Sequence, residues 1–337
     1  MKILFIGGTG NISTSVSRAC VARGFDLHLI VRGKRDVAIP GATLHRGDAR
    51  DTAFLGTVAA TAHWDAVVDW IAFTTADIER DIALLRGKTD QFVFISSASA
   101  YQKPPAHPVI TESTPLANPF WQYSRDKIAC EEMLNTAFRE TGFPVTIVRP
   151  SLTYDTVVPL AIGGWTEFTV IERIRKGEPI IVHGDGSSLW VLTHAEDFAK
   201  GFVGLLGHPQ AAGEAIHITS DEVLTWDQIY TTTARAAGRE PRIVHIPSDF
   251  IVGCEESLRG TLLGDKSRSV MFDNSKIRRL VPGYTATIPF HEGIRRTLEW
   301  FDADPSRRVV KAETSALFER ILRAYPGSVQ HNDQAGG

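Results

Sequence analysis

KILFIGGTGNIS, residues 2–13, is the stretch that decides the fold of this 337-residue chain. Its first five residues form a short apolar run that ends in glycines, which is typical of a buried strand in a parallel sheet. The glycines allow a tight turn and a close approach of the backbone to a pyrophosphate, and a helix is predicted over 11–23. An ordinary glycine-rich turn is the alternative, but placement directly after the first strand favours a nucleotide site.

The same alternation continues down the chain. Further strands are predicted over 26–31, 43–45, 66–69, 92–95 and 145–148, and helices over 52–60, 76–85 and 123–141. This spacing implies βαβ units and an α/β fold with a Rossmann-type, doubly wound parallel sheet. After Pro150, glycine and proline become more frequent and the strands shorten. We predict a dinucleotide-binding domain over 1–150, rejoined by parts of 190–250, a smaller α+β substrate lobe over 151–327, and a disordered tail over 328–337.

Composition narrows the class of protein. The chain is 43% hydrophobic and 22% charged with a net charge of −3, so no basic surplus points to nucleic acid or to an anionic membrane surface. No stretch approaches the roughly 20 apolar residues of a membrane span. The three cysteines are scattered without CxxC spacing, which fits reduced thiols and a cytoplasmic location. The histidines show no metal-ligand spacing, and we predict no metal site.

The residues around the first two strands indicate the cofactor. The candidate contacts in the glycine turn are Gly7, Thr9, Gly10, Asn11 and Ile12. The second strand is followed by the cations Arg32, Lys34 and Arg35 and by no acid that would hold a ribose 2′-hydroxyl, so NADP is favoured over NAD. A solvated basic loop is the alternative. Asp48, after the third strand, is either an acceptor for an adenine amino group or a helix cap.

The strongest chemical signal follows the strand at 92–95. That strand runs into SSASAY, residues 96–101, and ligands of open α/β sheets bind at the carboxyl ends of the strands. Tyr123 and Lys127 are four residues apart and therefore lie on one face of the next helix. Ser97, Tyr123 and Lys127 can thus converge beside a nicotinamide.

An ordered set of segments resembles the extended short-chain dehydrogenase/reductases, the superfamily of NAD(P)-dependent epimerases, dehydratases and reductases. The set comprises the glycine turn, SSASAY, YSRDK (123–127), IVRP (147–150), HGDG (183–186) with His194 and Asp197 beyond it, and FDNSK (272–276). The glycine turn with Ser13 and the FISSASAY run also resemble a branch that includes chloroplast stem-loop RNA-binding proteins and bacterial reductases.

The resemblance implies roles for the three residues. Tyr123 would be the general acid/base, Ser97 would bind the reacting oxygen, and Lys127 would hold the nicotinamide ribose. Ser97 stands four residues before Tyr101, as the catalytic hydroxyl does in the S-A-x-x-Y run of the epimerases, and Ser96 and Ser99 are the alternatives. An ammonium from Lys127 and an oxidised nicotinamide would favour the phenolate of Tyr123, whose unperturbed pKa is about 10. A homodimer through the helix at 123–141 is expected from the resemblance alone.

Two departures from the family's pattern narrow the range of possible substrates. Ala98 and Ser99 stand where sugar-nucleotide dehydratases carry an Asp-Glu pair, and Trp190 stands where epimerases usually carry a diphosphate-binding arginine. The candidate substrate contacts are Ser99, Trp121 and Trp190, with hydrophobic packing as the alternative for the tryptophans.

Together these patterns predict an NAD(P)-dependent oxidoreductase or epimerase that acts at a hydroxyl or ketone carbon of a sugar-like substrate. A dinucleotide-bound RNA-binding protein of the chloroplast type is an alternative, which the sequence pI of about 6.4 disfavours. A non-catalytic NADP-sensing regulator is another, which the retained Tyr123 disfavours.

Overall fold

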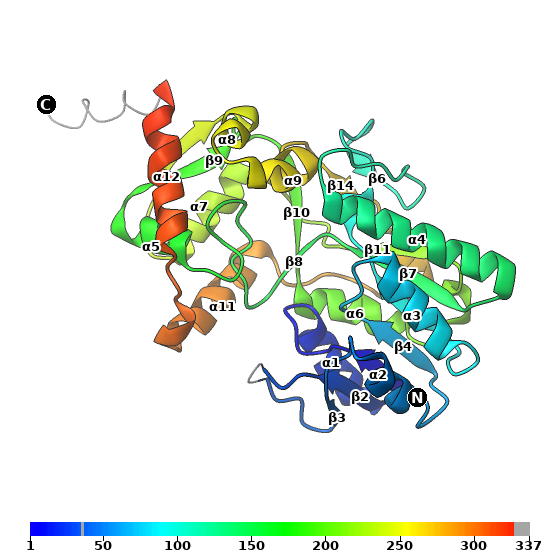
Figure 1. Cartoon of the computed structure of the whole chain (residues 1–337). Coiled ribbons are helices and arrows are strands. Elements are labelled where there is room, and N and C mark those ends of the chain that lie inside the picture. Colours follow the sequence, from blue (N-terminus) through cyan, green and yellow to red (C-terminus); the bar gives the residue numbers. More distant parts are fainter. Residues whose placement is uncertain (35–36, 327–337) are drawn as a thin grey trace, which may run out of the picture.

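A seven-stranded, fully parallel sheet forms the centre of the N-terminal half in the computed structural model, which describes residues 1–34 and 37–326 (Figure 1). The strand order is β3-β2-β1-β4-β5-β7-β11, and every neighbouring pair is parallel. The order reverses between β1 and β4, which is the topological switch point where such sheets bind ligands. The strands are β1 (Lys2–Ile6), β2 (Asp26–Val31), β3 (Thr43–Arg46), β4 (Ala66–Asp69), β5 (Phe92–Ile95), β7 (Val145–Pro150) and β11 (Ala215–Ile218).

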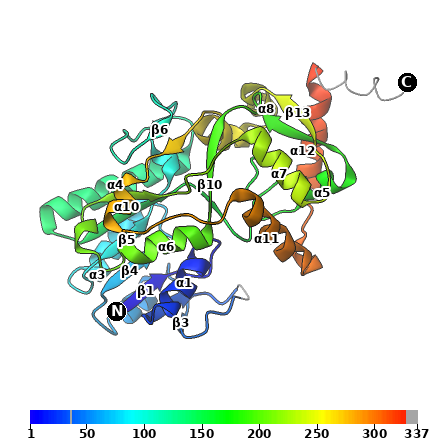
Figure 2. The ribbon, with the colours of Figure 1, turned by 180° about the vertical axis from the view of Figure 1, so that it is seen from behind.

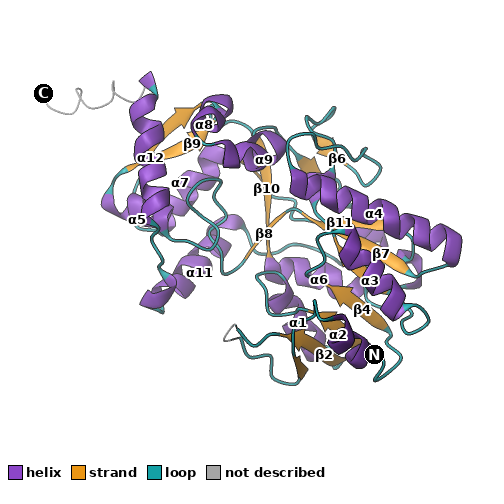
Figure 3. Cartoon of the chain, viewed as in Figure 1, coloured by secondary structure: helices purple, strands orange, loops and turns teal. Residues whose placement is uncertain are grey.

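Helices cover both faces of this sheet (Figure 3). Alternate residues of β1 point to opposite faces, so Ile3 and Phe5 pack with one set of helices and Leu4 and Ile6 with the other. The first set is α1 (Ser13–Ala22), α6 (Ala195–Leu205) and α10 (Ser275–Leu280). The second set is α2 (Thr52–Ala59), α3 (Thr75–Leu85) and α4 (Gln122–Thr141).

The predicted fold class is confirmed. All six predicted strands are present within one or two residues of their expected bounds, and so are the four predicted helices. The largest shifts are at β7, which continues through Pro150, and at α1, which begins at Ser13 rather than at residue 11. The tail predicted over 328–337 lies outside the described residues, as does Arg35.

The C-terminal half, whose ribbon is seen from behind in Figure 2, is less regular. It has its own hydrophobic core. Three small sheets occur in the described part, with orders β12-β10-β8, β13-β9 and β14-β6. Their strands are β6 (Val109–Ile110), β8 (Leu152–Tyr154), β9 (Pro179–His183), β10 (Leu189–His194), β12 (Val223–Thr225), β13 (Arg242–Ile246) and β14 (Met271–Phe272). The helices are α5 (Thr169–Lys176), α7 (Trp226–Ala236), α8 (Ser248–Cys254), α9 (Arg259–Thr261), α11 (Phe290–Asp302) and α12 (Ala312–Ala324).

The two halves are interleaved in sequence. After β10 the chain returns to the large sheet, since α6 packs against α1 and β11 pairs with β7. Directly after α9, residues Leu262–Lys266 form a π-helical turn, which we call the π turn. Across residues 1–34 and 37–326, no helix combines the length and the apolar character that crossing a membrane requires.

Candidate active site

A cleft of about 1030 Å³ lies between the carboxyl edge of the large sheet and the C-terminal half. Its walls include the glycine turn, the ends of β2, β3 and β5, the start of α4, and parts of the C-terminal half. The candidate catalytic, cofactor and substrate contacts that the structure describes all lie on this cleft, and these are Gly7, Thr9, Gly10, Asn11, Ile12, Arg32, Lys34, Asp48, Ser97, Ser99, Trp121, Tyr123, Lys127 and Trp190. The fold therefore brings all of them to one site.

The glycine turn has the shape of a phosphate cradle. Gly7 and Gly8 adopt φ values of +100° and +118°, which side chains rarely tolerate. A Cβ at Gly8 would lie 2.8 Å from a methyl group of Leu29. The first residue before α1, Ile12, provides no side-chain cap, so the helix begins with backbone N–H groups and a positive dipole end facing the cleft. These features fit the pyrophosphate of a dinucleotide.

Two polar residues of the turn have structural partners. Ser13, at the third glycine position, is buried, and its hydroxyl accepts a hydrogen bond of 2.8 Å from the Gly10 N–H. The Asn11 amide donates to the Thr153 carbonyl at 2.9 Å and accepts from the Thr156 N–H at 3.3 Å. Asn11 therefore ties the glycine turn to the segment after β8.

The adenosine end of the cleft carries the predicted cations. Arg32 and Lys34 are exposed and follow β2 along the wall of the cleft. Asp48 lies on the same wall, and its carboxylate accepts from the Arg50 N–H at 3.0 Å. The cap of α2 is Asp51, which accepts from two N–H groups of the helix. The helix-cap alternative for Asp48 is therefore wrong, although its carboxylate does hold the turn that precedes the cap.

Hydroxyl groups line the end of β5. The Ser97 and Ser99 hydroxyls are 2.9 Å apart, and Ser124, buried on α4, donates to Ser99 at 2.8 Å. Ser96 points the other way and donates to the buried Glu131 carboxylate at 2.5 Å. The chain of hydroxyls fixes Ser97 on the side of the cleft that Tyr123 occupies.

Lys127 is held firmly by the backbone. Its ammonium donates to the carbonyls of Ala72 and Ile95, each at 2.7 Å, and lies 4.5 Å from the centre of the Phe73 ring. Burial lowers the pKa of Lys127 to about 8. The side chain thus joins the ends of β4 and β5 at the sheet's switch-point side, where a ribose would be placed.

Tyr123 is close to both partners, but its acidity differs from the expectation. Burial raises the pKa of Tyr123, a hydrogen bond from Ser97 opposes that rise, and the charge of Asp265 adds to it. The Lys127 ammonium is 5.8 Å from the centre of the Tyr123 ring and is committed to two carbonyls. The expected lowering of this pKa by Lys127 is therefore not found among the protein's own groups, because burial dominates.

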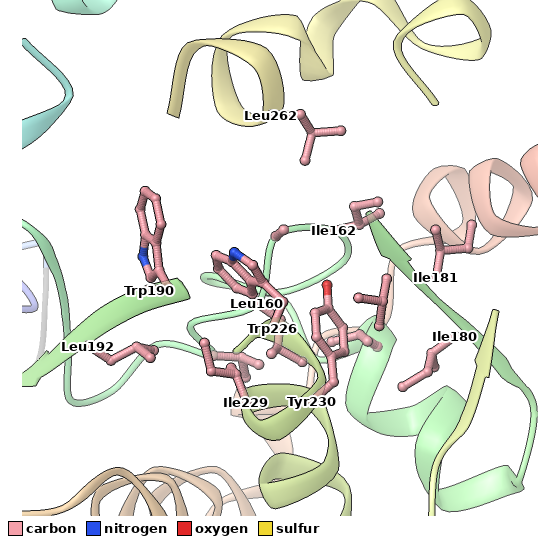
Figure 4. Packing of buried hydrophobic residues seen from close by; sticks show 14 of the residues in the cluster. Leu160, Ile162, Ile180, Ile181, Trp190, Leu192, Trp226, Ile229, Tyr230 and Leu262 are labelled. Atoms are coloured by element: carbon pink, nitrogen blue, oxygen red, sulfur yellow. The ribbon is translucent and has the colours of Figure 1, made fainter. Parts of the chain in front are cut away.

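The two predicted aromatic contacts, Trp121 and Trp190, both line the cleft. Trp121 packs 5.0 Å from the Tyr123 ring and lies against α9, where a Cβ at Gly260 would overlap the indole. Trp190 rises from β10 beside Trp226 of α7, with ring centres 5.6 Å apart (Figure 4). Trp190 is buried in the core of the C-terminal half and also lines the cleft.

Several cleft residues were missed by the sequence-based prediction. These are Lys103, Asp265 and Lys266, which line the substrate end. Trp165, which the sequence places either on the substrate cleft or in the core, also lines the cleft and is 48% exposed. Trp165 has a φ of +67° and is held by two backbone hydrogen bonds to Val158. Lys103 follows two residues after Tyr101 in the run SSASAYQK, and this position was the sequence signal that could have placed it on the cleft. Nothing in the local sequence marked Asp265 or Lys266 as cleft residues.

The fold and the site define a Rossmann-fold enzyme with a dinucleotide cradle and a serine, a tyrosine and a lysine at the adjoining end of one cleft. The chain matches the NAD dependent epimerase/dehydratase family over residues 3–219 and belongs to that family. Members of this family are oxidoreductases and epimerases. Within the described residues, no group of three or more His, Cys, Asp or Glu side chains is arranged to hold a metal ion.

Known proteins place the chain within this family. It is 28% identical to the 2′-dehydrokanamycin reductase of Streptomyces kanamyceticus over 84% of this chain and 80% of the reductase. It is 29% identical to the chloroplast stem-loop binding protein of 41 kDa b of Arabidopsis thaliana over 75% of this chain and 68% of that protein.

The solved structure of UDP-glucose 4-epimerase from Bifidobacterium longum, in complex with NAD+ and UDP, has a TM-score of 0.72 at 19% identity. The match covers 91% of this chain and all of the epimerase, and at this identity it supports the fold alone.

Proposed function

We propose that the protein is an NADP-preferring oxidoreductase or epimerase that acts at a hydroxyl or ketone carbon of a sugar-like substrate. The convergence of Ser97, Tyr123 and Lys127 on one cleft, at the far end of the dinucleotide cradle, carries this proposal. A bound nicotinamide cofactor would supply the hydride donor or acceptor.

Each of the three residues has a defined task. The Tyr123 phenol transfers a proton to or from the substrate oxygen, and Ser97 donates a hydrogen bond to that oxygen. Burial raises the pKa of Tyr123, and in the reduction of a ketone the phenol would donate its proton to the substrate oxygen. Lys127, anchored on two carbonyls, positions the cofactor ribose and adds positive charge beside the phenol.

The preference for NADP is supported by charge. Arg32 and Lys34 are exposed on the cleft wall at the end of β2, where a ribose 2′-phosphate would lie. Arginine and lysine are the side chains that bind phosphate through charge-assisted hydrogen bonds.

A carbohydrate-type substrate is supported by the wall opposite Tyr123. Trp165, which is 48% exposed, offers indole surface to the cleft, and aromatic rings are suited to stacking on the apolar face of a sugar ring. Two similar proteins, the 2′-dehydrokanamycin reductase and the UDP-glucose 4-epimerase of Lactobacillus helveticus, have names that refer to carbohydrates.

The proposal is tested by measuring cofactor binding and turnover separately. NADPH and NADH are titrated by fluorescence, and a panel of keto-sugars and the corresponding sugars is then assayed for cofactor oxidation or reduction and for epimerisation. We expect NADPH to bind more tightly than NADH and at least one carbohydrate to react. Binding of neither cofactor would contradict the proposal.

The similarity to the chloroplast stem-loop binding protein supports RNA binding as a second candidate function. The net charge of −3 disfavours it. A gel shift with a stem-loop RNA at two salt concentrations separates the two: we expect no salt-dependent complex, and a complex that weakens steeply with salt would favour RNA binding.

A further inference from the structure

Three charged side chains gather at the substrate end of the cleft, and neither the proposed reaction nor the cofactor accounts for them. Asp265 lies between two lysines, 3.0 Å from the Lys266 ammonium and 3.7 Å from the Lys103 ammonium. The side chains of Lys103, Lys266 and Asp265 are only 3%, 10% and 14% exposed, yet all three residues line the cleft. We call this cluster the Lys-Asp-Lys pocket.

The pocket is built on the face of a tryptophan. The ammonium groups of Lys103 and Lys266 lie 5.7 and 5.9 Å from the centre of the Trp190 ring. The Trp190 indole N–H is buried and has no hydrogen-bond partner among the described residues. Trp190 thus lies close to both ammonium groups, and its indole N–H is a further donor that the described residues leave unused.

The π turn is anchored by side chains from distant elements. The Lys266 carbonyl accepts hydrogen bonds from the Trp226 indole at 3.1 Å and from His183 at 3.0 Å. Asn118, which precedes α4, donates to the Gly264 carbonyl at 2.7 Å. π-helical turns are rare and are frequently found at functional sites. This anchoring holds Asp265 and Lys266 in fixed positions facing the cleft.

Lys103 reaches the pocket from the other wall. Its N–H donates to the Ala117 carbonyl at 2.8 Å, which fixes the segment that follows SSASAY. Tyr123 is near this cluster, since Asp265 acts on the phenol electrostatically. The pocket therefore adjoins the reacting end of the cleft.

Charge in the pocket is unbalanced. Two ammonium groups share one carboxylate, and burying an uncompensated charge is unfavourable unless a further partner is supplied. Another acid on the cleft wall, Glu167, has partners of its own, because its two oxygens accept from the hydroxyls of Thr169 and Thr314 at 2.6 and 3.1 Å. The excess positive charge and the indole N–H together match an anionic oxygen group.

We propose that Lys103, Lys266 and the Trp190 N–H bind an anionic group, a carboxylate or a phosphate, carried by the sugar-like substrate. This inference rests on the proposed function of the same cleft and specifies its substrate class. Asp265 spaces the two ammonium groups and keeps a vacant pocket from carrying two unpaired charges. A cationic amino sugar is disfavoured at this position.

Equilibrium binding tests the inference without turnover. The NADPH-loaded protein is titrated with D-glucuronate, D-glucose 1-phosphate, D-glucose and D-glucosamine, and dissociation constants are measured by NMR. We expect at least one anion to bind about tenfold or more tightly than D-glucose, as a charge-assisted pair implies, and D-glucosamine to bind least. The tighter of the two anions identifies the group as carboxylate or phosphate.

Variants assign the effect to the pocket. The double variant Lys103→Met/Lys266→Met should lose the preference for the anion, whereas Asp265→Asn should strengthen anion binding by removing the competing carboxylate. Lys311→Met is the matched control, since Lys311 is half exposed beside Glu167, outside the cleft wall, and should change nothing. The opposite signs expected for the lysine and aspartate variants separate recognition from general damage to the fold.

The outcomes that overturn the inference are equal affinities for glucose and for both anions, including no binding of any of them, or weaker anion binding in Asp265→Asn. These outcomes are independent of the proposed reaction. The variant Tyr123→Phe, which should be inactive, should keep the anion preference. A fully active Tyr123→Phe variant that still prefers the anion would contradict the proposed mechanism but would leave the anion-binding inference intact.

Discussion

The two walls of the cleft are built in different ways. The wall formed by the large sheet consists of strand ends and one long helix, and the buried charges on it and behind it are paired: Lys127 donates to two carbonyls, and Arg149 pairs with Glu131 at 2.6 Å. The opposite wall consists of loops, short strands and the π turn, and there two lysines share one aspartate. From this difference we propose that the sheet wall holds the reacting groups and that the opposite wall selects the substrate.

Rigidity of the sheet wall comes from a buried network beneath Ser97. Glu131 accepts from Ser96 and from Arg149, and the Arg149 guanidinium stacks 4.8 Å from the centre of the Tyr101 ring. The Tyr101 hydroxyl and His217 are 3.0 Å apart. Fully satisfied polar networks of this kind hold their members in a single arrangement. Ser97 is thus presented on a stiff base.

The proposed role of the sheet wall is tested most strongly at Lys127. Lys127→Met should lower kcat/KM by about a hundredfold or more, since it removes the charge and the ribose contact proposed beside Tyr123. Lys276→Met is the control: Lys276 also donates to a backbone carbonyl, that of Ala215, but lies outside the cleft. Steady-state kinetics of both variants measure the effect, and equal losses would contradict the assignment.

A change in the cofactor cradle should have the next largest effect. Gly8→Ala places a side chain at a φ of +118° and against Leu29, so we expect weaker NADPH binding and a loss of about 1–3 kcal/mol in the free energy of unfolding. Gly24→Ala also has a positive φ, but no atom lies within 4 Å of its Cβ. That control should lose stability only. Fluorescence titration and urea unfolding measure the two quantities, and unchanged NADPH affinity in Gly8→Ala would refute the cradle.

On the opposite wall, Gly260→Ala should affect the substrate and not the cofactor. The added Cβ would displace the Trp121 indole and shift α9 relative to α4, so KM for the substrate should rise several-fold while NADPH affinity stays unchanged. Gly253→Ala, on neighbouring α8 with open space around the Cβ, serves as control. If cofactor affinity fell together with substrate affinity, the division between the two walls would be wrong.

At the adenosine end, the expected effect is smaller than that of Lys127→Met. Arg32→Ala/Lys34→Ala should weaken NADPH binding by about tenfold and leave NADH binding unchanged, because only NADPH carries the 2′-phosphate. Both residues are exposed, so solvent and salt screen their charges. Isothermal titration at low and moderate salt measures the difference. If the binding of NADPH and of NADH were weakened equally, these cations would not be the groups that recognise the 2′-phosphate.

The two walls also differ in how much of their structure could be predicted from the sequence. The period of the apolar residues and the glycine turn predicted the large sheet, and the carboxyl ends of its strands fixed where Ser97, Tyr123 and Lys127 would meet. The pocket at Lys103 and Asp265 was not predictable, because the π turn is held by long-range contacts from β9, α7 and Asn118 that leave no local pattern. The rise in the pKa of Tyr123 on burial was also not predicted, because the extent of burial depends on the packed structure.

The most direct test of the central claim is single-turnover reduction by the Tyr123→Phe variant with NADPH bound. Phenylalanine keeps the ring that packs against Trp121 and Phe73 and removes only the hydroxyl. The account predicts NADPH affinity near that of the natural protein and a rate of substrate reduction lower by about a hundredfold or more. A variant that reduces substrate at the natural rate would contradict the account.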